Sequence, residues 1–276
     1  MALETIQYEV KDKVAHVTLN RPNHGNALNE TMHRELIEAW ERINADDNVW
    51  AILVQGAGKD FCVGEDAKEI AEAYRHGGKV ARWEKDEQWL KKHSQPPIFG
   101  WPRPMDALPA KPLVTVVHGR CYGAGMMFVA NNAFALAADD AEFSLPNVNQ
   151  GTAPMHEVLV LTRTMARTPV LGMALLGKHE KMTANRAREL GLVIETAPKD
   201  KLQLRVAEIM DMLVNQAGPL AVRAGFLEWW LSFDLPAWER RSVAGTYSSE
   251  VTVTTLDFKE GPRAFAEKRK PRWNAG

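Results

Sequence analysis

The sequence has little cysteine, almost no net charge and no long apolar run, and each absence excludes a class of protein. Cys62 and Cys121 are the only cysteines in 276 residues, so a disulfide framework is excluded and cytosolic thiols are expected. The 34 basic residues balance 35 acidic ones, which leaves no basic excess for nucleic acid or membranes. No apolar run reaches the roughly 18 residues of a spanning helix, and the charged N-terminus is unlike a signal peptide. We expect a cytoplasmic protein with no nucleic-acid or membrane partner.

The order of the expected elements indicates an α/β protein. Apolar runs predict buried strands at residues 14–19, 50–55 and 113–117, and a last short strand is expected at 193–196. Helical patterns separate these runs. From residue 198 onward only helical patterns remain, and every helix there has an apolar side.

The chain therefore divides into an α/β core at residues 1–197, which carries the site, and a helical region at 198–276. Helices with apolar faces pack on a core or on another subunit. We expect the second region to serve oligomerisation and to close the site.

Two early segments matter for the site. Asn29 or Thr31 can cap a helix. The apolar face of that helix is formed by Leu36, Ile37, Trp40 and Ile43. Residues 79–93 predict an exposed amphipathic helix, and the proline-rich segment 94–106 after it predicts a long loop, either a binding loop or a surface excursion.

The most informative stretch is a buried strand that runs into a glycine turn. The strand at 113–117 is followed by Gly123, Ala124 and Gly125, and an apolar helix then begins. Such a turn presents unpaired backbone N–H groups, which can bind a phosphate or the oxyanion of a carbonyl. The phosphate alternative is weak, because the turn lacks both the third glycine of a dinucleotide fingerprint and the Lys-Ser or Lys-Thr pair of a P-loop. An oxyanion hole needs a second N–H donor, and the turn at 64–65 is a candidate.

Seven short motifs, in order over about 250 residues, resemble those of the crotonase (enoyl-CoA hydratase/isomerase) superfamily. They are LNRP at 19–22 with NALN at 26–29, FCVGEDAK at 61–68, HGRCYGAG at 118–125, DAEFSLP at 140–146, GTAP at 151–154, ANRARELGLV at 184–193, and KEGPRAF at 259–265 with EKRK at 267–270.

The resemblance implies a fold, a substrate and an assembly. The fold is a spiral of ββα turns followed by a helical C-terminal region that builds trimers, commonly paired into hexamers. The substrate is an acyl-CoA thioester, with coenzyme A as part of the substrate, no separate cofactor and no metal. We therefore expect a homotrimer or homohexamer.

The resemblance also implies site residues by position. The thioester oxygen would lie between the backbone N–H groups of Glu65 and Ala124. The coenzyme A contacts would come from Asn26, Ala27, Leu28, Ala67 and Lys68, together with Gly123 of the turn. The basic C-terminal helix would reach the coenzyme A of a neighbouring subunit.

The sequence departs from the family at the two glutamates with which its hydratases activate water. Met127 and Asn147 occupy those positions. Neither side chain can take a proton, so ordinary enoyl-CoA hydration lacks its acid/base pair. This chain is identified as a divergent member of the superfamily.

Other residues could transfer protons instead. Glu65 either serves the oxyanion hole as a base or faces solvent or Lys68. His156 and Glu157 either supply an acid or base or serve only at a helix N-terminus. Asn147 can orient a water or a carbonyl.

Three residues are expected to line the acyl pocket, namely Met127, Trp101 and Tyr122, the last either as a phenol donor or as a packing residue. They favour a bulky or aromatic acyl group. We expect a lyase, isomerase or hydrolase acting through an enolate, with a non-catalytic acyl-CoA-binding or structural protein as the alternative.

Overall fold

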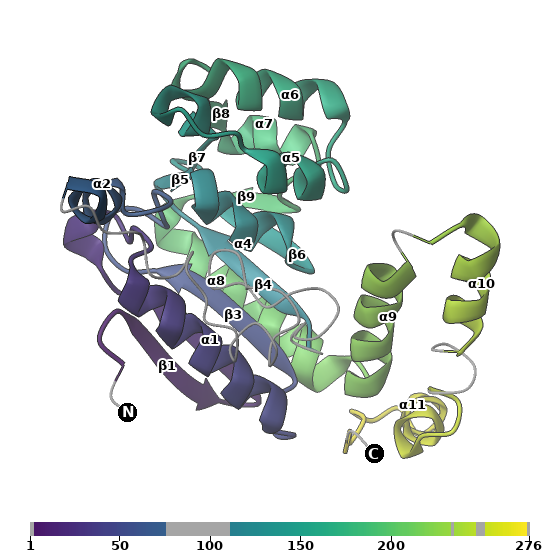
Figure 1. Cartoon of the computed structure of the whole chain (residues 1–276). Helices are drawn as coiled ribbons and strands as arrows, with labels where there is room; N and C mark the ends of the chain where they lie inside the picture. The colour runs from purple at the N-terminus through teal and green to yellow at the C-terminus, as the bar shows by residue number, and fades with distance from the viewer. Residues whose placement is uncertain (1–2, 76–110, 233–234, 247–251, 275–276) are drawn as a thin grey trace, which may run out of the picture.

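The computed structural model describes residues 3–75, 111–232, 235–246 and 252–274, and its centre is a twisted six-stranded sheet (Figure 1). The first two strands are antiparallel and all later pairs are parallel. In spatial order the strands are β1 (Ile6–Lys11), β2 (Val14–Leu19), β3 (Ala51–Gly56), β4 (Leu113–Val117), β6 (Phe134–Ala138) and β9 (Glu195–Ala197).

Strands β3 and β4 are apolar without alternation because both faces of the sheet are covered. One face packs under α1 (Glu30–Ala45), through Val17, Ile52 and Val54. The other packs under α8 (Lys199–Asp211), where Leu53, Val114 and Val116 meet the apolar side of that helix. The first helix of the region predicted at 198–276 therefore completes the core of the sheet.

A second, three-stranded sheet lies above the first, with the order β5-β7-β8. Its strands are β5 (Arg120–Tyr122), β7 (Glu142–Ser144) and β8 (Met182–Thr183). The sequence did not predict these strands, because two or three residues are too short to show an alternating pattern. The predicted last strand of the large sheet lies two residues later, in β9.

Short helices connect and cover the two sheets. They are η1 (Pro22–His24), α2 (Ala67–Arg75), η4 (Gly123–Gly125), α4 (Met126–Ala130), η5 (Pro146–Gln150), α5 (Met155–Leu161), α6 (Arg167–Leu176), η6 (Gly177–His179) and α7 (Ala184–Glu189). The side chain of Asn29 caps α1 by accepting a hydrogen bond from Met32 N, so this residue is the cap rather than Thr31.

The C-terminal helices form an arm beside the sheet (Figure 1). The arm contains η7 (Met212–Gln216), α9 (Pro219–Ser232), α10 (Ala237–Gly245) and α11 (Leu256–Ala266). The chain then turns back, and Asn274 N donates to the carboxylate of Asp257 at 3.0 Å. No helix among the described residues is long and apolar enough to cross a membrane.

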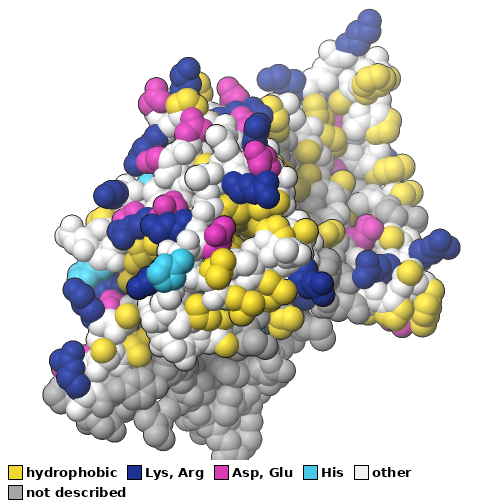
Figure 2. All heavy atoms as spheres, turned by 90° about the horizontal axis from the view of Figure 1, so that it is seen from above, with side chains coloured by type: hydrophobic (Ala, Val, Ile, Leu, Met, Phe, Trp, Pro, Cys, Tyr) yellow, Lys and Arg dark blue, Asp and Glu magenta, His cyan; other side chains and the backbone are white. Residues whose placement is uncertain are grey.

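Large apolar side chains are exposed along this arm, where Figure 2 shows hydrophobic atoms spread over its surface. Trp238 is 74% exposed and Phe265 87% exposed, and Phe258 on α11 is half exposed. The expected amphipathic helix at 79–93 and the proline-rich loop at 94–106 lie outside the described residues.

Candidate active site

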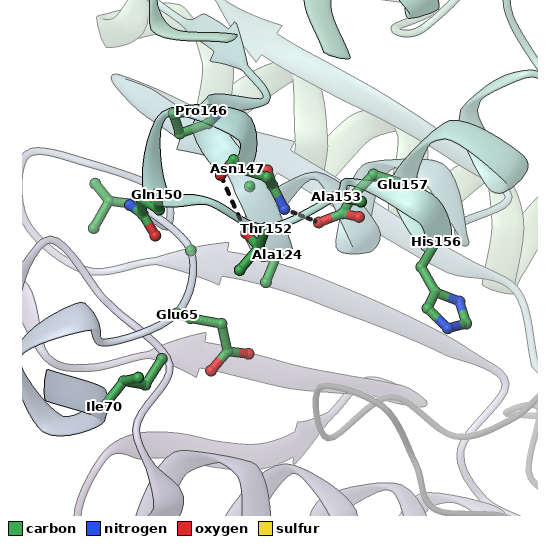
Figure 3. Close-up of a pocket in the computed structure, with 13 residues that line it drawn as sticks. Glu65, Ile70, Ala124, Pro146, Asn147, Gln150, Thr152, Ala153, His156 and Glu157 are labelled. Atoms are coloured by element: carbon green, nitrogen blue, oxygen red, sulfur yellow. Dashed lines mark hydrogen bonds between the residues drawn. The ribbon is translucent and has the colours of Figure 1, made fainter. Parts of the chain in front are cut away.

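One cavity of about 170 Å³ brings together residues from four separate parts of the chain (Figure 3). The segment before α2 and α2 itself form one side, and the glycine turn, η5 and the start of α5 form the rest. The lining residues are Val63, Gly64, Glu65, Ile70, Gly123, Ala124, Pro146, Asn147, Gln150, Thr152, Ala153, His156 and Glu157.

Two glycine-containing turns approach each other closely at this cavity. Gly64 has φ +96°, and a Cβ added there would lie 3.0 Å from the carbonyl oxygen of Tyr122 and 3.3 Å from the amide nitrogen of Ala124. Gly123 also has a positive φ, of +50°. Only glycine adopts such backbone conformations at little cost and leaves room for the approach. The amide of Ala124 therefore lies next to the Gly64–Glu65 peptide, as an oxyanion hole requires.

Backbone pairing between neighbouring loops holds the two turns in place. Cys62 N donates to the carbonyl of Arg120 at 3.1 Å, and Tyr122 N donates to the carbonyl of Cys62 at 2.9 Å. The carboxylate of Asp60 receives two hydrogen bonds from the Arg120 guanidinium, at 2.8 and 2.7 Å. These hydrogen bonds lower the pKa of Asp60 below its ordinary value, against the opposing effect of burial. The two turns are thus held by hydrogen bonds from the loops on either side of them.

The two cysteines near the turns are fully buried core residues. Burial raises the pKa of the Cys62 thiol to about 12 and also raises that of Cys121. A thiol that stays protonated at neutral pH is a poor nucleophile. The chemistry of the cavity therefore depends on other groups.

The side chain of Glu65 does not extend into solvent. Its carboxylate oxygens lie 3.1 and 3.3 Å from Nε2 of His33, a buried residue of α1. The sequence-based alternatives for Glu65 were a base at the oxyanion hole, or a side chain that faces solvent or Lys68, and neither alternative included His33. The sequence did contain a signal for this contact, because His33 is a titratable residue on the apolar face of α1, one turn before Leu36.

On the opposite side of the cavity, the amide of Asn147 donates to a carboxylate oxygen of Glu157 at 3.0 Å (Figure 3). Glu157 is 2% exposed. Because the Asn147 nitrogen faces Glu157, the amide oxygen faces the other way; it is buried and accepts no hydrogen bond from any described residue. It lies near the turn, 3.7 Å from where a Cβ of Gly123 would be.

The remaining predicted acid/base candidate lies at the edge of the cavity. His156 is exposed, and its ring points away from Asn147 and Glu157 (Figure 3). The cavity thus has two carboxylates, Glu65 and Glu157, on different walls.

The segment predicted to contact coenzyme A lies beside the first glycine turn. Leu28 N donates to the carbonyl of Gly64 at 2.8 Å, and Asp66 N donates to the carbonyl of Leu28 at 3.0 Å. Asn26 is buried and its side chain donates to the carbonyls of Ala57 and Asp60. Ala27 is also buried.

Ala67 and Lys68 are exposed at the start of α2. Asn26 therefore holds the loop in shape through its hydrogen bonds, whereas Ala67 and Lys68 are exposed at the surface, where a ligand can contact them.

Two of the three predicted acyl-pocket residues, Met127 and Tyr122, are not among the described residues that line this cavity. Met127 is buried in α4. Tyr122 points to the second sheet, where its hydroxyl donates a hydrogen bond to Glu142. Trp101 lies outside the described residues. Within the described part of the chain, no cluster of His, Cys, Asp and Glu could hold a metal ion.

Comparison with known proteins shows which family this chain resembles. The family model described as enoyl-CoA hydratase/isomerase matches residues 9–276. Mevalonyl-coenzyme A hydratase SIDH of Beauveria bassiana is 30% identical over 268 residues, which cover 93% of this chain and 90% of that protein. Hydroxycinnamoyl-CoA hydratase-lyase of Pseudomonas fluorescens is 29% identical over 222 residues, covering 80% and 76%.

A solved structure, an enoyl-CoA hydratase/isomerase from Mycobacterium paratuberculosis, superposes on the whole of both chains. Its TM-score is 0.89 at 40% sequence identity. The predicted α/β fold of the crotonase type is confirmed.

Proposed function

Since the chain belongs to the enoyl-CoA hydratase/isomerase family, we propose that it is an enzyme that acts on an acyl-CoA thioester through an enolate. The thioester oxygen would accept hydrogen bonds from the amides of Glu65 and Ala124. The close approach of Gly64 to Ala124 N supports this pairing. Removing one donor from an oxyanion hole costs about 3 kcal/mol of transition-state stabilisation.

Glu157 is the proposed base for the α-proton. The observation that carries the proposal is the hydrogen bond from Asn147 to Glu157 in the wall of the cavity. Asn147 occupies the position of a family glutamate, and its amide holds a different carboxylate close by. The hydrogen bond from the amide nitrogen holds the carboxylate, a group that can act as a general base, in the wall of the cavity. In this proposal the site keeps a carboxylate, but that carboxylate belongs to Glu157 on α5 and not to the residue at the position of the family glutamate.

Asn147 also offers its unpaired amide oxygen to the cavity. A buried acceptor without a partner favours a ligand that supplies a donor, either a water or a substrate hydroxyl. Glu65 supplies the second carboxylate, from the opposite wall. Two carboxylates that can exchange protons with the same acyl group suit isomerisation, lyase cleavage or hydrolysis.

The proposed acyl group is bulky or aromatic. The relative named hydroxycinnamoyl-CoA hydratase-lyase supports this part of the proposal. Coenzyme A enters as part of the substrate, along the segment 26–28 and the exposed start of α2.

We also propose a homotrimer or homohexamer built by the C-terminal arm. The exposure of Trp238, Phe258 and Phe265 supports it, since such apolar area is normally covered by a partner. Sedimentation equilibrium measures the assembly directly. A monomer at micromolar concentration would contradict this part alone.

The test is solvent deuterium exchange at the α-carbon for a panel of acyl-CoA thioesters that includes cinnamoyl-type substrates, followed by mass spectrometry. We expect exchange in the native protein and a loss of about 10²- to 10⁴-fold in Glu157→Gln, the usual contribution of a general base. Glu208→Gln, an exposed substitution on α8, is the matched control.

Two results would overturn the proposal. Binding of acyl-CoA without exchange or turnover on any member of the panel would favour the alternative, a non-catalytic acyl-CoA-binding protein. Undiminished exchange in Glu157→Gln, with loss only in His156→Ala, would move the base to His156.

A further inference from the structure

A buried histidine lies behind the carboxylate of Glu65 and does not itself line the cavity. His33 is 3% exposed and comes from the first turns of α1. Its Nε2 atom lies 3.1 Å from one oxygen of Glu65 and 3.3 Å from the other. The Glu65 side chain is 16% exposed and faces the cavity.

The backbone holds this pair in register. Leu28 pairs with Gly64 and Asp66 through hydrogen bonds of 2.8 and 3.0 Å. The next residue, Asn29, caps α1. The start of α1 is therefore fixed to the segment that carries Glu65, and the imidazole meets the carboxylate without a flexible connection.

The contacts of the two ring nitrogens define the protonation state of His33. A carboxylate only accepts hydrogen bonds, so Nε2 must carry a proton to face it at this distance. Nδ1 is buried and has no hydrogen-bond partner among the described residues. A second proton on Nδ1 would create a buried, unpaired donor on a charged ring, which is more costly than a bare lone pair. The neutral tautomer with hydrogen on Nε2 fits the site.

We infer that His33 is a positioning residue for Glu65: its Nε2–H fixes the carboxylate in the cavity wall opposite Asn147 and Glu157. The inference rests on the proposed function. A donor shared between both oxygens limits rotation of the carboxylate before it meets substrate. The histidine transfers no proton itself, because its second nitrogen has no partner to receive or supply one.

A packing residue would explain the burial of His33 but not its contacts. A side chain that only fills the core would be apolar. The neighbouring core positions of α1 are occupied by such side chains, Leu36 and Trp40. A histidine in their row brings a polar group into the core, where it needs a hydrogen-bond partner. That partner is the Glu65 carboxylate at the cavity.

The test compares His33→Leu, which removes the donor, with His33→Gln, which keeps an N–H at similar reach. The measured quantities are kcat and KM for the reaction found in the acyl-CoA panel, or the α-carbon exchange rate where no net product forms. We expect His33→Leu to lower the rate about 10- to 100-fold with KM unchanged, because misplacing a reacting group by about 1 Å can cost 10²-fold. His33→Gln should recover most of the loss.

A double-mutant cycle separates positioning from packing. In a Glu65→Ala background, His33→Leu should cause no further loss, because the carboxylate that it positions is gone. Arg34→Ala, an exposed neighbour on α1, controls for disturbance of the helix. Equal losses from His33→Leu in both backgrounds, or equal rates for His33→Leu and His33→Gln, would overturn the inference.

A spectroscopic measurement tests the same inference without turnover. Labelling the eight histidines with ¹⁵N and assigning His33 by its loss in His33→Gln gives the tautomer from its two nitrogen shifts. We expect the neutral Nε2–H form at neutral pH. An imidazolium or an Nδ1–H tautomer would overturn the inference even if the enzyme is active, whereas absent exchange with the expected tautomer would count against the proposed function alone.

Discussion

The two walls of the cavity are built by different means. One wall consists of backbone: the Gly64–Glu65 peptide and the turn at Gly123 and Ala124, held together by hydrogen bonds between loops. The other consists of side chains: Asn147 from η5 and Glu157 from α5, joined by a single hydrogen bond. We call them the backbone wall and the side-chain wall.

The two walls differ in how much substitution their construction tolerates. The backbone wall needs glycine at positive φ and close packing, and almost any substitution there disturbs it. The side-chain wall needs only compatible donors and acceptors, so it tolerates exchanges of residue type that keep a hydrogen bond such as that from Asn147 to Glu157. In the proposed function, the wall that resists substitution holds the oxyanion, and the more tolerant wall supplies the base.

Among the substitutions that test this comparison of the two walls, Gly64→Ala in the backbone wall should have the largest effect. The new Cβ would lie 3.0 Å from Tyr122 O and 3.3 Å from Ala124 N, and the residue would keep a φ of +96° that alanine avoids. Relief of this contact separates the two amides of the oxyanion hole. We expect the α-carbon exchange rate to fall about 10²- to 10³-fold, the effect of losing one donor.

Gly172→Ala is the matched control for this substitution. A Cβ at Gly172 meets nothing within 4 Å, and the residue lies inside α6. Alanine there should stabilise the protein by about 0.5–1 kcal/mol and leave exchange as it is. If Gly64→Ala exchanged as fast as Gly172→Ala, the backbone wall would not be the oxyanion site.

A smaller effect is expected from Asn147→Asp in the side-chain wall. The substitution keeps the shape and places a carboxylate oxygen where the amide nitrogen now lies, 3.0 Å from Glu157. Two carboxylates so close share one proton until the pH is raised, so the base is lost at neutral pH. We expect exchange to fall about 10- to 100-fold at pH 7, toward the lower end of a general-base effect, and to recover at higher pH.

The pH profile of exchange distinguishes this explanation from simple damage. Asn147→Leu removes the donor without adding a charge, so its exchange rate should not recover with pH. Parallel profiles for the two variants would show that the pair of carboxylates does not govern the reaction.

The backbone wall could largely be predicted from the sequence, and the side-chain wall could not. The strand β4 and the turn at Gly123 follow from a local apolar run and from glycine, and the cap at Asn29 follows from local hydrogen bonding. These signals act over a few residues, so periodicity and turn chemistry reveal them.

The side-chain contacts depend on separations that no local pattern records. His33 and Glu65 are 32 residues apart, and Asn147 and Glu157 are 10 apart on different elements. Three of these four residues, Glu65, Asn147 and Glu157, were predicted as candidates from the sequence, but which side chains face one another follows only from the fold. The phenol of Tyr122 shows the same limit. The direction of this side chain depends on β5, and a strand of three residues is too short to be predicted from the sequence.

The hydrogen bonds between Asp60 and Arg120 support the backbone wall, so we expect Asp60→Asn to lower the free energy of unfolding. The buried carboxylate accepts charge-assisted bonds from Arg120, which are worth about 2 kcal/mol. Since these bonds lower the pKa of Asp60, its contribution is complete above the unfolded pKa of about 3.9 and is lost as the pH falls through the folded value.

Urea unfolding of both proteins between pH 7 and pH 3 checks this prediction. The difference in free energy of unfolding should be constant near neutral pH and should shrink in the acidic range. A difference that stays constant throughout would mean that the charge on Asp60 does not hold the loops together.

The smallest effect on stability is expected from Tyr122→Phe. This substitution tests whether the phenol of Tyr122 acts in the cavity or only in the second sheet. Its carbonyl oxygen borders Gly64, but its hydroxyl donates to Glu142 in the second sheet, away from the cavity. Removing the hydroxyl should cost about 1 kcal/mol of stability, the net value of one hydrogen bond, while exchange continues at the native rate. Thermal unfolding and α-carbon exchange measure the two quantities on the same sample. Loss of exchange without loss of stability would mean that the phenol reaches the substrate, which is one of the two alternatives that the sequence left open, and the side-chain wall would then extend beyond Asn147 and Glu157.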